Sequence, residues 1–228
     1  MPNNLDQTME QASQALAQTD YLLAESLCLE ALAAAKQAED WNYYARILLP
    51  LQEARRQRRI IAADGIIQLG TTKYHGPHLQ EWLTQNNAGC IIITSPCKEQ
   101  DAADLLAQAR NQKLHVEVLY AQVDDDNWTI RIPNYPSIEF TTPAPPPAWC
   151  NKPIPAAMIP ESGHSIYANG PAGLFLYICE QLGNVAIDSL PSDLNHTDRI
   201  QALEQHLHAI GDHEFLHQQL TTAAKDAS

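Results

Sequence analysis

The sequence predicts an α/β protein with an N-terminal helical hairpin, a small central parallel or mixed sheet with flanking helices, and C-terminal helices. The first observation is a change in hydrophobic spacing near residue 60, from helical to strand-like. The second is a pair of apolar, β-branched runs at 89–94 and 115–120, which are typical of buried parallel strands. The third is the helical pattern at 98–112 between them, since strand–helix–strand order indicates a right-handed parallel unit.

Composition divides the chain into four predicted segments. These are a helical segment at 1–59, an α/β domain at 60–142, a proline-rich linker at 143–170 and a C-terminal helical segment at 171–228. Nine prolines lie between residues 133 and 163, and proline is excluded from helix interiors and central strands. The third segment is therefore expected to be extended and to lie along the surface of the α/β domain.

Strong helix formers, mainly alanine, leucine and glutamine, fill the first segment. They predict helices at about 5–18, 20–38 and 40–59. Asp40 is suited to cap the third helix, because its carboxylate can accept backbone N–H groups of the first turn. Pro50 lies inside that helix and is expected to kink or break it.

One face of the second helix carries a characteristic series of residues. They are Tyr21, Ala24, Cys28, Ala31 and Leu32. This series resembles the second helix of a tetratricopeptide repeat, although the Trp-x-x-Leu-Gly that opens such repeats is absent and Lys36 replaces their closing proline. The resemblance implies a helical hairpin that docks onto another surface. Stacked repeats need about three units, and the sequence contains one. The hairpin is therefore expected to pack on its own chain, on a protein partner or on a second copy.

The segment 60–142 alternates strand and helix patterns. The expected elements are a strand at 60–69, a helix at 78–85, a strand at 89–94, a helix at 98–112, a strand at 115–120 and a hairpin strand at 128–132. Farther along the chain, helical patterns return at about 171–183, 196–209 and 212–225. Gly211 separates the last two helices, and Asp212 is suited to cap the final one.

Bulk composition limits the classes of partner. Acidic residues outnumber basic ones by 27 to 14, which gives a net charge of −13, so a nucleic acid would be repelled. No apolar run approaches the roughly 20 residues that cross a bilayer, and the polar N-terminus lacks a signal-peptide pattern. Five cysteines without a repeated short spacing predict no disulfide framework. The expectation is a cytoplasmic protein without a membrane partner or a cofactor.

The first functional hypothesis is a non-enzymatic interaction or scaffold protein with a protein partner, which includes the possibility of a homo-oligomer. Aromatic residues and arginine dominate binding hot spots. The predicted partner-binding residues are Trp41, Tyr43, Tyr44, Arg55, Arg56, Arg58 and Arg59. The alternative for the arginines is a set of cations near a helix C-terminus or on a solvated helix face.

The second hypothesis is a small-ligand site for an anion or nucleotide at the strand ends. In open parallel sheets, ligands bind beyond the carboxyl ends of the strands. The residues expected there are Thr71, Thr94, Ser95 and Cys97. Free amides at a helix start could hold an anion, and Cys97 could have a lowered pKa. The alternative is that Ser95 only caps the following helix and that Cys97 has no chemical role.

The third hypothesis is a zinc-dependent hydrolase. His213-Glu214-x-x-His217 has the form in which two histidines one helical turn apart bind zinc and the glutamate acts as general base. Only eleven residues follow His217, so no downstream third ligand of the known spacings is available, although His206 or His208 could supply one. The alternative is a solvated or lightly packed helix face with Glu214 favourably placed near its N-terminus.

Overall fold

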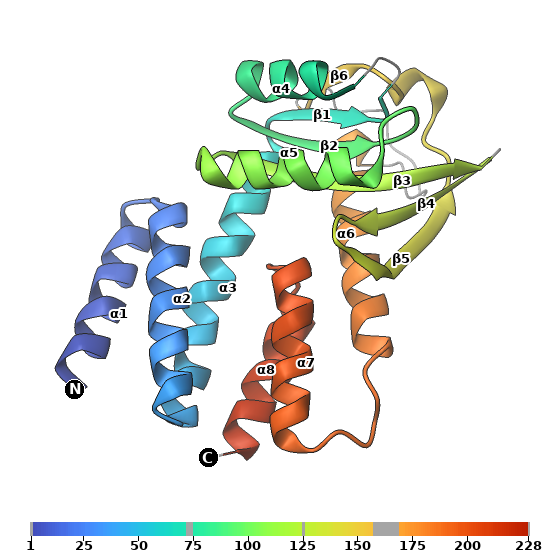
Figure 1. Ribbon diagram of the computed structural model, residues 1–228. Helices are drawn as coiled ribbons and strands as arrows, with labels where there is room; N and C mark the ends of the chain where they lie inside the picture. Colours follow the sequence, from blue (N-terminus) through green and yellow to red (C-terminus); the bar gives the residue numbers. More distant parts are fainter. Residues whose placement is uncertain (1, 72–74, 125, 157–168, 228) are drawn as a thin grey trace. The chain divides into compact units, whose positions relative to one another are not determined.

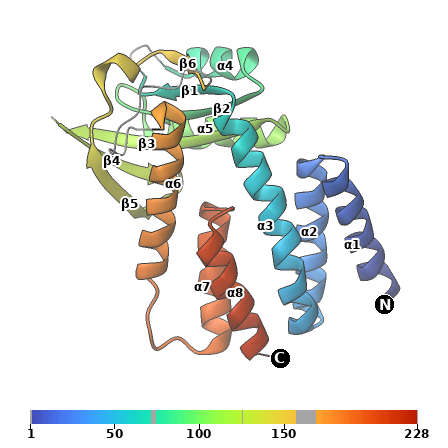
Figure 2. The same cartoon turned by 180° about the vertical axis from the view of Figure 1, so that it is seen from behind.

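The computed structural model describes residues 2–71, 75–124, 126–156 and 169–227. The chain forms two compact units (Figures 1 and 2). The helical unit comprises Met1–Arg58 and Ala186–Ser228, and the sheet unit comprises Arg59–Val185. The helices from the two ends of the chain thus form one unit, where the sequence predicted separate segments. The described residues of the predicted linker at 143–170 belong to the sheet unit.

Three helices begin the chain, and acidic caps start two of them. They are α1 (Pro2–Ala17), α2 (Tyr21–Gln37) and α3 (Trp41–Ala63). The Asp20 carboxylate accepts the Leu23 N–H at 3.1 Å, and the Asp40 carboxylate accepts the Tyr43 N–H at 2.9 Å. Each satisfies a backbone donor that has no partner within the helix. The predicted cap at Asp40 is therefore confirmed.

Helix α3 is longer than predicted. It continues through Pro50, so the break that was one of the two expected outcomes does not occur, while a kink there stays a prediction. It also extends to Ala63, so the predicted strand at 60–69 begins only at Ile66. The residues Ile60–Ala63 are all apolar. In so short an apolar run, the spacing of hydrophobic residues cannot distinguish a strand from a buried turn of helix.

The predicted apolar face of α2 is buried within the helical unit. Ala24, Cys28 and Ala31 have almost no exposed surface. Ala24 packs with Ala15 of α1 and Ala54 of α3, and α1 lies beside α2 as an antiparallel hairpin (Figure 1). The small side chains let the three helices approach closely. The hairpin geometry agrees with the expectation, while the tetratricopeptide resemblance stays a prediction.

Three helices follow the sheet. They are α6 (Gly170–Asp188), α7 (His196–Ala209) and α8 (Glu214–Asp226). Asn195 caps α7, since its side-chain oxygen accepts the Asp198 N–H at 2.9 Å. The predicted cap of α8 at Asp212 is wrong, because His213 occupies that position. A neutral imidazole has one unprotonated nitrogen, so it can accept a backbone N–H as a carboxylate does.

The sheet unit contains a mixed six-stranded sheet in the order β5-β4-β3-β2-β1-β6. Its strands are β1 (Ile66–Leu69), β2 (Ala88–Ile93), β3 (His115–Asp124), β4 (Asn127–Ile132), β5 (Tyr135–Pro143) and β6 (Pro153–Pro155). The first three are parallel, with Ile91 opposite Gln68 and Val118. The predicted parallel pairing of 89–94 with 115–120 is confirmed.

Helices cover both faces of this sheet. On one face, α4 (His75–Gln85) and α5 (Glu99–Asn111) pack on Ile91, Ile93 and Val118. On the other face, Phe140 of β5 contacts Tyr177 of α6 with 6.0 Å between ring centroids. Figures 1 and 2 show α5 and α6 on opposite sides of the sheet.

Both edge strands lie between residues 133 and 163, where the nine prolines occur, and the sequence predicted neither of them. β5 forms one edge, and β6 pairs antiparallel with β1 at the other. Pro153 and Pro155 lack the N–H that a central strand would need. The flanking residues donate in their place: Asn151 N–H to Leu69 O at 2.7 Å and Ala156 N–H to Gly65 O at 3.0 Å. Proline is therefore compatible with these edge positions.

The close approach of β1 and α4 to Gly89 generates a prediction. A Cβ at Gly89 would lie 2.4 Å from the Ile66 carbonyl oxygen and 3.0 Å from the Trp82 ring. Gly89→Ala should therefore lower the free energy of unfolding by about 1–3 kcal/mol through overpacking, measured by urea denaturation. The control is Ala88→Gly at the neighbouring position, which should cost only about 0.5–1 kcal/mol. Equal costs would contradict the close approach.

Candidate functional site

An apolar cavity of about 250 Å³ lies inside the helical unit, and it is called the leucine cavity below. Its walls come from α2, α3, α7 and α8. Six leucines line it: Leu29, Leu32, Leu48, Leu51, Leu207 and Leu220. The spacing of each pair on α2 and α3 is three residues, which places both leucines on one helix face. The cavity is thus built from segments more than 150 residues apart in the sequence.

The exposed residues of the lining come from α2 and from α7, which contributes His208. Leu29 keeps 37% of its surface exposed, and the Lys36 side chain keeps 46%. The leucines from α3, by contrast, are almost fully buried. Leu29 therefore forms an apolar rim that an incoming side chain would meet first.

A carboxylate–lysine–tyrosine cluster forms part of the polar lining. Glu204 of α7 accepts a hydrogen bond from Lys36 Nζ at 2.5 Å and one from the Tyr44 hydroxyl at 2.7 Å. Burial raises the pKa of Tyr44, and the hydrogen bond to Glu204 raises it further. Tyr44 is therefore a permanent donor, and the cluster joins α2 and α3 to α7.

Arg55 forms the other charged part of the lining. Its Nε donates to Glu25 Oε1 at 2.8 Å, and its Nη1 donates to the carbonyl oxygens of Leu207 at 3.4 Å and Gly211 at 3.1 Å. Arg58 Nη1 donates to the second oxygen of Glu25. Leu207 lies in the last turn of α7, where the helix dipole favours a cation, and Gly211 follows the helix. One guanidinium thus connects α2, α3 and the α7–α8 turn.

The charges of this cluster are largely buried. The side chains of Arg55 and Glu25 expose only 10% and 15% of their surface. Burial would raise the pKa of Glu25, but the positive charges of Arg58 and Arg55 and their hydrogen bonds outweigh it, and the pKa is lowered. Glu25 is therefore ionised and neutralises part of the arginine charge.

Most of the predicted partner-binding residues are engaged inside the protein. Arg55 and Arg58 bind Glu25, as described. The fully buried Tyr44 stacks edge-on against Trp41 with 5.6 Å between centroids, and the Tyr43 hydroxyl donates to Asp6 at 2.7 Å.

The other two arginines of the block, Arg56 and Arg59, differ in exposure. Arg59 lies 3.9 Å from Glu117 in the sheet unit, and its side chain is mostly buried. Arg56 is 52% exposed and pairs with Glu53. Of the four predicted arginines, it alone remains at the surface. The arginine block is therefore mainly a source of internal ion pairs.

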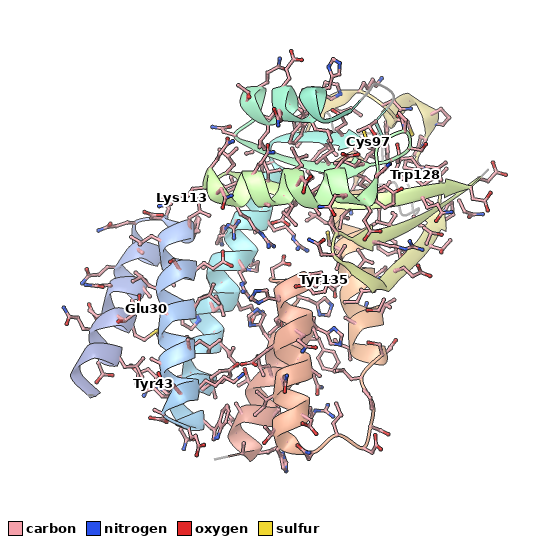
Figure 3. The ribbon with its side chains drawn as sticks, in the orientation of Figure 1. Glu30, Tyr43, Cys97, Lys113, Trp128 and Tyr135 are labelled. Atoms are coloured by element: carbon pink, nitrogen blue, oxygen red, sulfur yellow. The ribbon has the colours of Figure 1, made fainter. Side chains whose placement is uncertain are left out.

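The predicted strand-end residues are brought together at one end of the sheet. Thr71 and Thr94 are buried and hydrogen-bond each other: Thr71 N–H donates to Thr94 Oγ1 at 3.0 Å, and Thr71 Oγ1 donates to Thr94 O at 2.8 Å. Figure 3 shows Cys97 and Trp128 at this end of the sheet, and both are buried. Each hydroxyl is thus bonded to the backbone of the other threonine, and the Trp128 ring lies nearby, close to Gly70.

Ser95 does not cap the following helix as the alternative predicted. It is exposed, and the cap position of α5 is Lys98, three residues later, directly before the helix begins at Glu99. The Lys98 N–H donates to the Asp101 carboxylate at 2.7 Å, which reverses the usual direction of capping. The loop residues 72–74, which follow β1, lie outside the described part of the chain.

The two predicted zinc ligands hold the start of α8. His213 precedes the helix, and its Nδ1 accepts the Leu216 N–H at 3.3 Å. His217 lies in the first turn, and its Nε2 is 2.8 Å from the Gly211 carbonyl oxygen. Burial lowers the pKa of His217 to about 4, so the ring is neutral and donates from Nε2. The two imidazoles therefore stabilise a turn, and only one of them lies on the helix.

Within the described ranges, no group of three or more His, Cys, Asp or Glu side chains is placed to hold a metal ion. Among the helices in those ranges, none combines the length and apolarity that crossing a bilayer requires. No protein-family model, curated protein or solved structure matches this chain.

Sequence reasoning missed the leucine cavity and the two carboxylates that bind its cations, Glu204 for Lys36 and Glu25 for Arg55. The leucine pairs, three residues apart in the predicted helices, could have indicated which helix faces form the cavity walls. Nothing in the sequence relates Leu29 to Leu207, because their proximity depends on tertiary packing. The carboxylates carried no signal, since neither belongs to a recognisable motif.

The buried ion cluster predicts a large difference in stability between the loss of a buried ion pair and the loss of an exposed one. Glu25→Ala would leave Arg55 and Arg58 without their carboxylate and should lower the free energy of unfolding by about 3–5 kcal/mol. Arg56→Ala removes only an exposed pair and should cost within about 0.5 kcal/mol. Guanidinium denaturation monitored by circular dichroism measures both. A small cost for Glu25→Ala would show that the cluster is not buried.

Burial of neutral His217 predicts a loss of stability in mild acid. Between pH 6.5 and 4 the unfolded chain binds a proton that the folded protein does not, so stability falls as pH falls through this range. A pKa shift from 6.5 to about 4 corresponds to roughly 3 kcal/mol. His217→Gln keeps a donor for Gly211 O and should lose this part of the pH dependence.

The measurement is the free energy of unfolding of both proteins at several pH values. Glu25 also responds to acid because its pKa is lowered, but it is present in both proteins. The difference between them therefore isolates His217. Parallel pH profiles would contradict the assignment of a buried neutral imidazole.

Proposed function

We propose that this chain is a non-enzymatic protein-interaction protein that binds its partner through the leucine cavity. The observation that carries the proposal is an open cavity with six leucines in its walls and an exposed leucine at its rim. Water in contact with such walls is released when an apolar side chain enters, which favours binding. Exposed apolar concavities of this kind mark interaction sites.

The size of the cavity favours a protein partner over a small molecule. Its volume of about 250 Å³ is below the roughly 300–1,000 Å³ that is usual for small-molecule sites. It suits one or two side chains that project from a partner. Anchors of this type, seated in well-packed pockets, supply most of the binding energy in protein interfaces.

The chemistry of the lining supports binding more than catalysis. Lys36 and Glu204 are bonded to each other, and Arg55 is bonded to Glu25 and to backbone carbonyls. These charged groups have structural partners and are not aimed together at a reacting atom. The predicted nucleophile Cys97 and the predicted metal ligands lie outside the cavity lining.

The resemblance of the first fifty residues to a tetratricopeptide repeat is consistent with this role. Helices of that family pack on one another through small residues and present another face to a partner. In α2, Ala24 and Ala31 pack inward, whereas Leu29 and Ala33 line the cavity. The partner could be a second copy of the chain, which light scattering of the purified protein would detect.

The proposal predicts that Leu29→Glu abolishes partner capture. A carboxylate at the rim would have to be desolvated when an apolar anchor enters, so captured partners should fall at least tenfold. The matched control is Leu23→Glu, which places the same charge on the same helix at a 48% exposed leucine outside the cavity. Affinity capture with quantitative mass spectrometry compares the two variants with the natural protein.

Melting temperatures of both variants must stay close to that of the natural protein for this comparison to hold. Partners that are retained by Leu23→Glu and lost with Leu29→Glu would support the cavity as the binding site. Equal retention by all three proteins would contradict the proposal.

A further inference from the structure

The exposed residues of the leucine cavity are of two chemical kinds. Among the described residues, four members of the lining are exposed: Leu29, Ala33 and Lys36 of α2 and His208 of α7. The first two are apolar, and the other two carry N–H donors. None of these four is a carboxylate. A side chain that enters the cavity therefore passes apolar groups and hydrogen-bond donors.

The Lys36 ammonium can bind more than its present partner. Its Nζ carries three N–H donors, and among the described residues it donates to one acceptor, Glu204 Oε2, at 2.5 Å. The Lys36 side chain also keeps 46% of its surface exposed. Two of its donors are therefore left for solvent or for an occupant of the cavity.

The carboxylate of the lining, Glu204, is already used on both oxygens. Oε2 accepts from Lys36, and Oε1 accepts from the Tyr44 hydroxyl at 2.7 Å. Tyr44 keeps its proton, because burial and this hydrogen bond raise its pKa. A cation on an occupant would have to compete with both donors. The entrance of the cavity thus offers more donors than acceptors.

The other cation of the lining, Arg55, is held inside the protein. Its side chain is only 10% exposed. It donates to the Glu25 carboxylate and to the carbonyl oxygens of Leu207 and Gly211. Lys36 is therefore the cation that an occupant can reach without breaking a buried ion pair.

We propose that the occupant of the leucine cavity is an acidic amphipathic segment of a partner protein, an inference that rests on the proposed function. Its apolar anchor enters among the leucines, and a neighbouring glutamate or aspartate accepts hydrogen bonds from Lys36 Nζ, with the His208 ring as a second donor. A lysine or arginine in the same position would meet donors instead of acceptors. An amphipathic helix presents an apolar anchor and a neighbouring carboxylate in one element.

The net charge of the chain opposes this partner at long range only. A charge of −13 repels an acidic segment in solution. At physiological ionic strength this repulsion is screened beyond about 8 Å, whereas the carboxylate and Lys36 interact at hydrogen-bond distance. The groups in contact therefore decide which segment is retained, and the long-range field slows its arrival.

The test uses the full-length chain and two fluorescent peptides of about 18 residues with the same leucine positions. One peptide has glutamate on its polar face and the other has lysine. Fluorescence anisotropy gives both dissociation constants at about 0.15 M salt, where long-range repulsion is largely screened. The leucine–glutamate peptide should bind at least about fivefold more tightly. Equal or tighter binding of the leucine–lysine peptide would overturn the inference.

Two matched variants separate contact at the cavity from the charge of the whole chain. Lys36→Gln and Lys225→Gln each remove one positive charge, and Lys225 is an exposed residue of α8 outside the lining. Only Lys36→Gln should weaken binding of the leucine–glutamate peptide, by about fivefold or more. Lys36→Arg keeps the charge and N–H donors, so it should restore binding. Equal effects of the two glutamine variants would overturn the inference.

The remaining outcomes distinguish this inference from the proposed function. If both peptides bind equally and only Leu29→Glu, not Leu23→Glu, weakens them, the cavity binds apolar anchors but the acidic partner is refuted. If neither peptide binds while capture of another protein still depends on Leu29, the proposed function stands and the inference fails. If capture also ignores Leu29, both fail.

Discussion

The helical unit depends on one buried guanidinium. Arg55 of α3 binds the Glu25 carboxylate of α2 and two carbonyl oxygens at the end of α7. Removing these charges from water is costly, and only a complete set of partners offsets that cost. The partners come from both ends of the chain, so α2, α3 and α7 cannot shift independently. This constraint explains why the arginine block, conspicuous in the sequence, is used mainly for internal pairing.

The same constraint accounts for the leucine cavity. Leucine faces of neighbouring helices normally interdigitate, because an empty gap forfeits dispersion contacts. Here the Arg55 cluster and the Lys36–Glu204 pair both contribute to the lining of the cavity. Each holds its helices at a distance set by hydrogen-bond geometry. Closing the gap between the leucines would require breaking these ion pairs, so the cavity is retained in the fold at a cost in packing.

Local chemistry decided which features the sequence could predict. The parallel strands 89–94 and 115–120 were predicted because their β-branched runs need no tertiary information. The edge strand β6 was missed because Pro153 and Pro155 argue against a strand, while the compensating donors Asn151 and Ala156 belong to its flanks. His213 was predicted on a helix, whereas its ring caps one. The site itself was out of reach, because its walls meet only through the tertiary fold.

Burial determines which cations of the helical unit stay at its surface. The side chains of Arg55 and Arg58 bind Glu25 and expose only 10% and 14% of their surface, so these two cations are held in the interior. Lys36 and Arg56 also pair with carboxylates, yet about half of each side chain remains exposed. A buried cation needs a complete set of partners, whereas an exposed one is also solvated by water. The packing of the helical unit therefore fixes the positions of Arg55 and Arg58 much more strictly than those of Lys36 and Arg56.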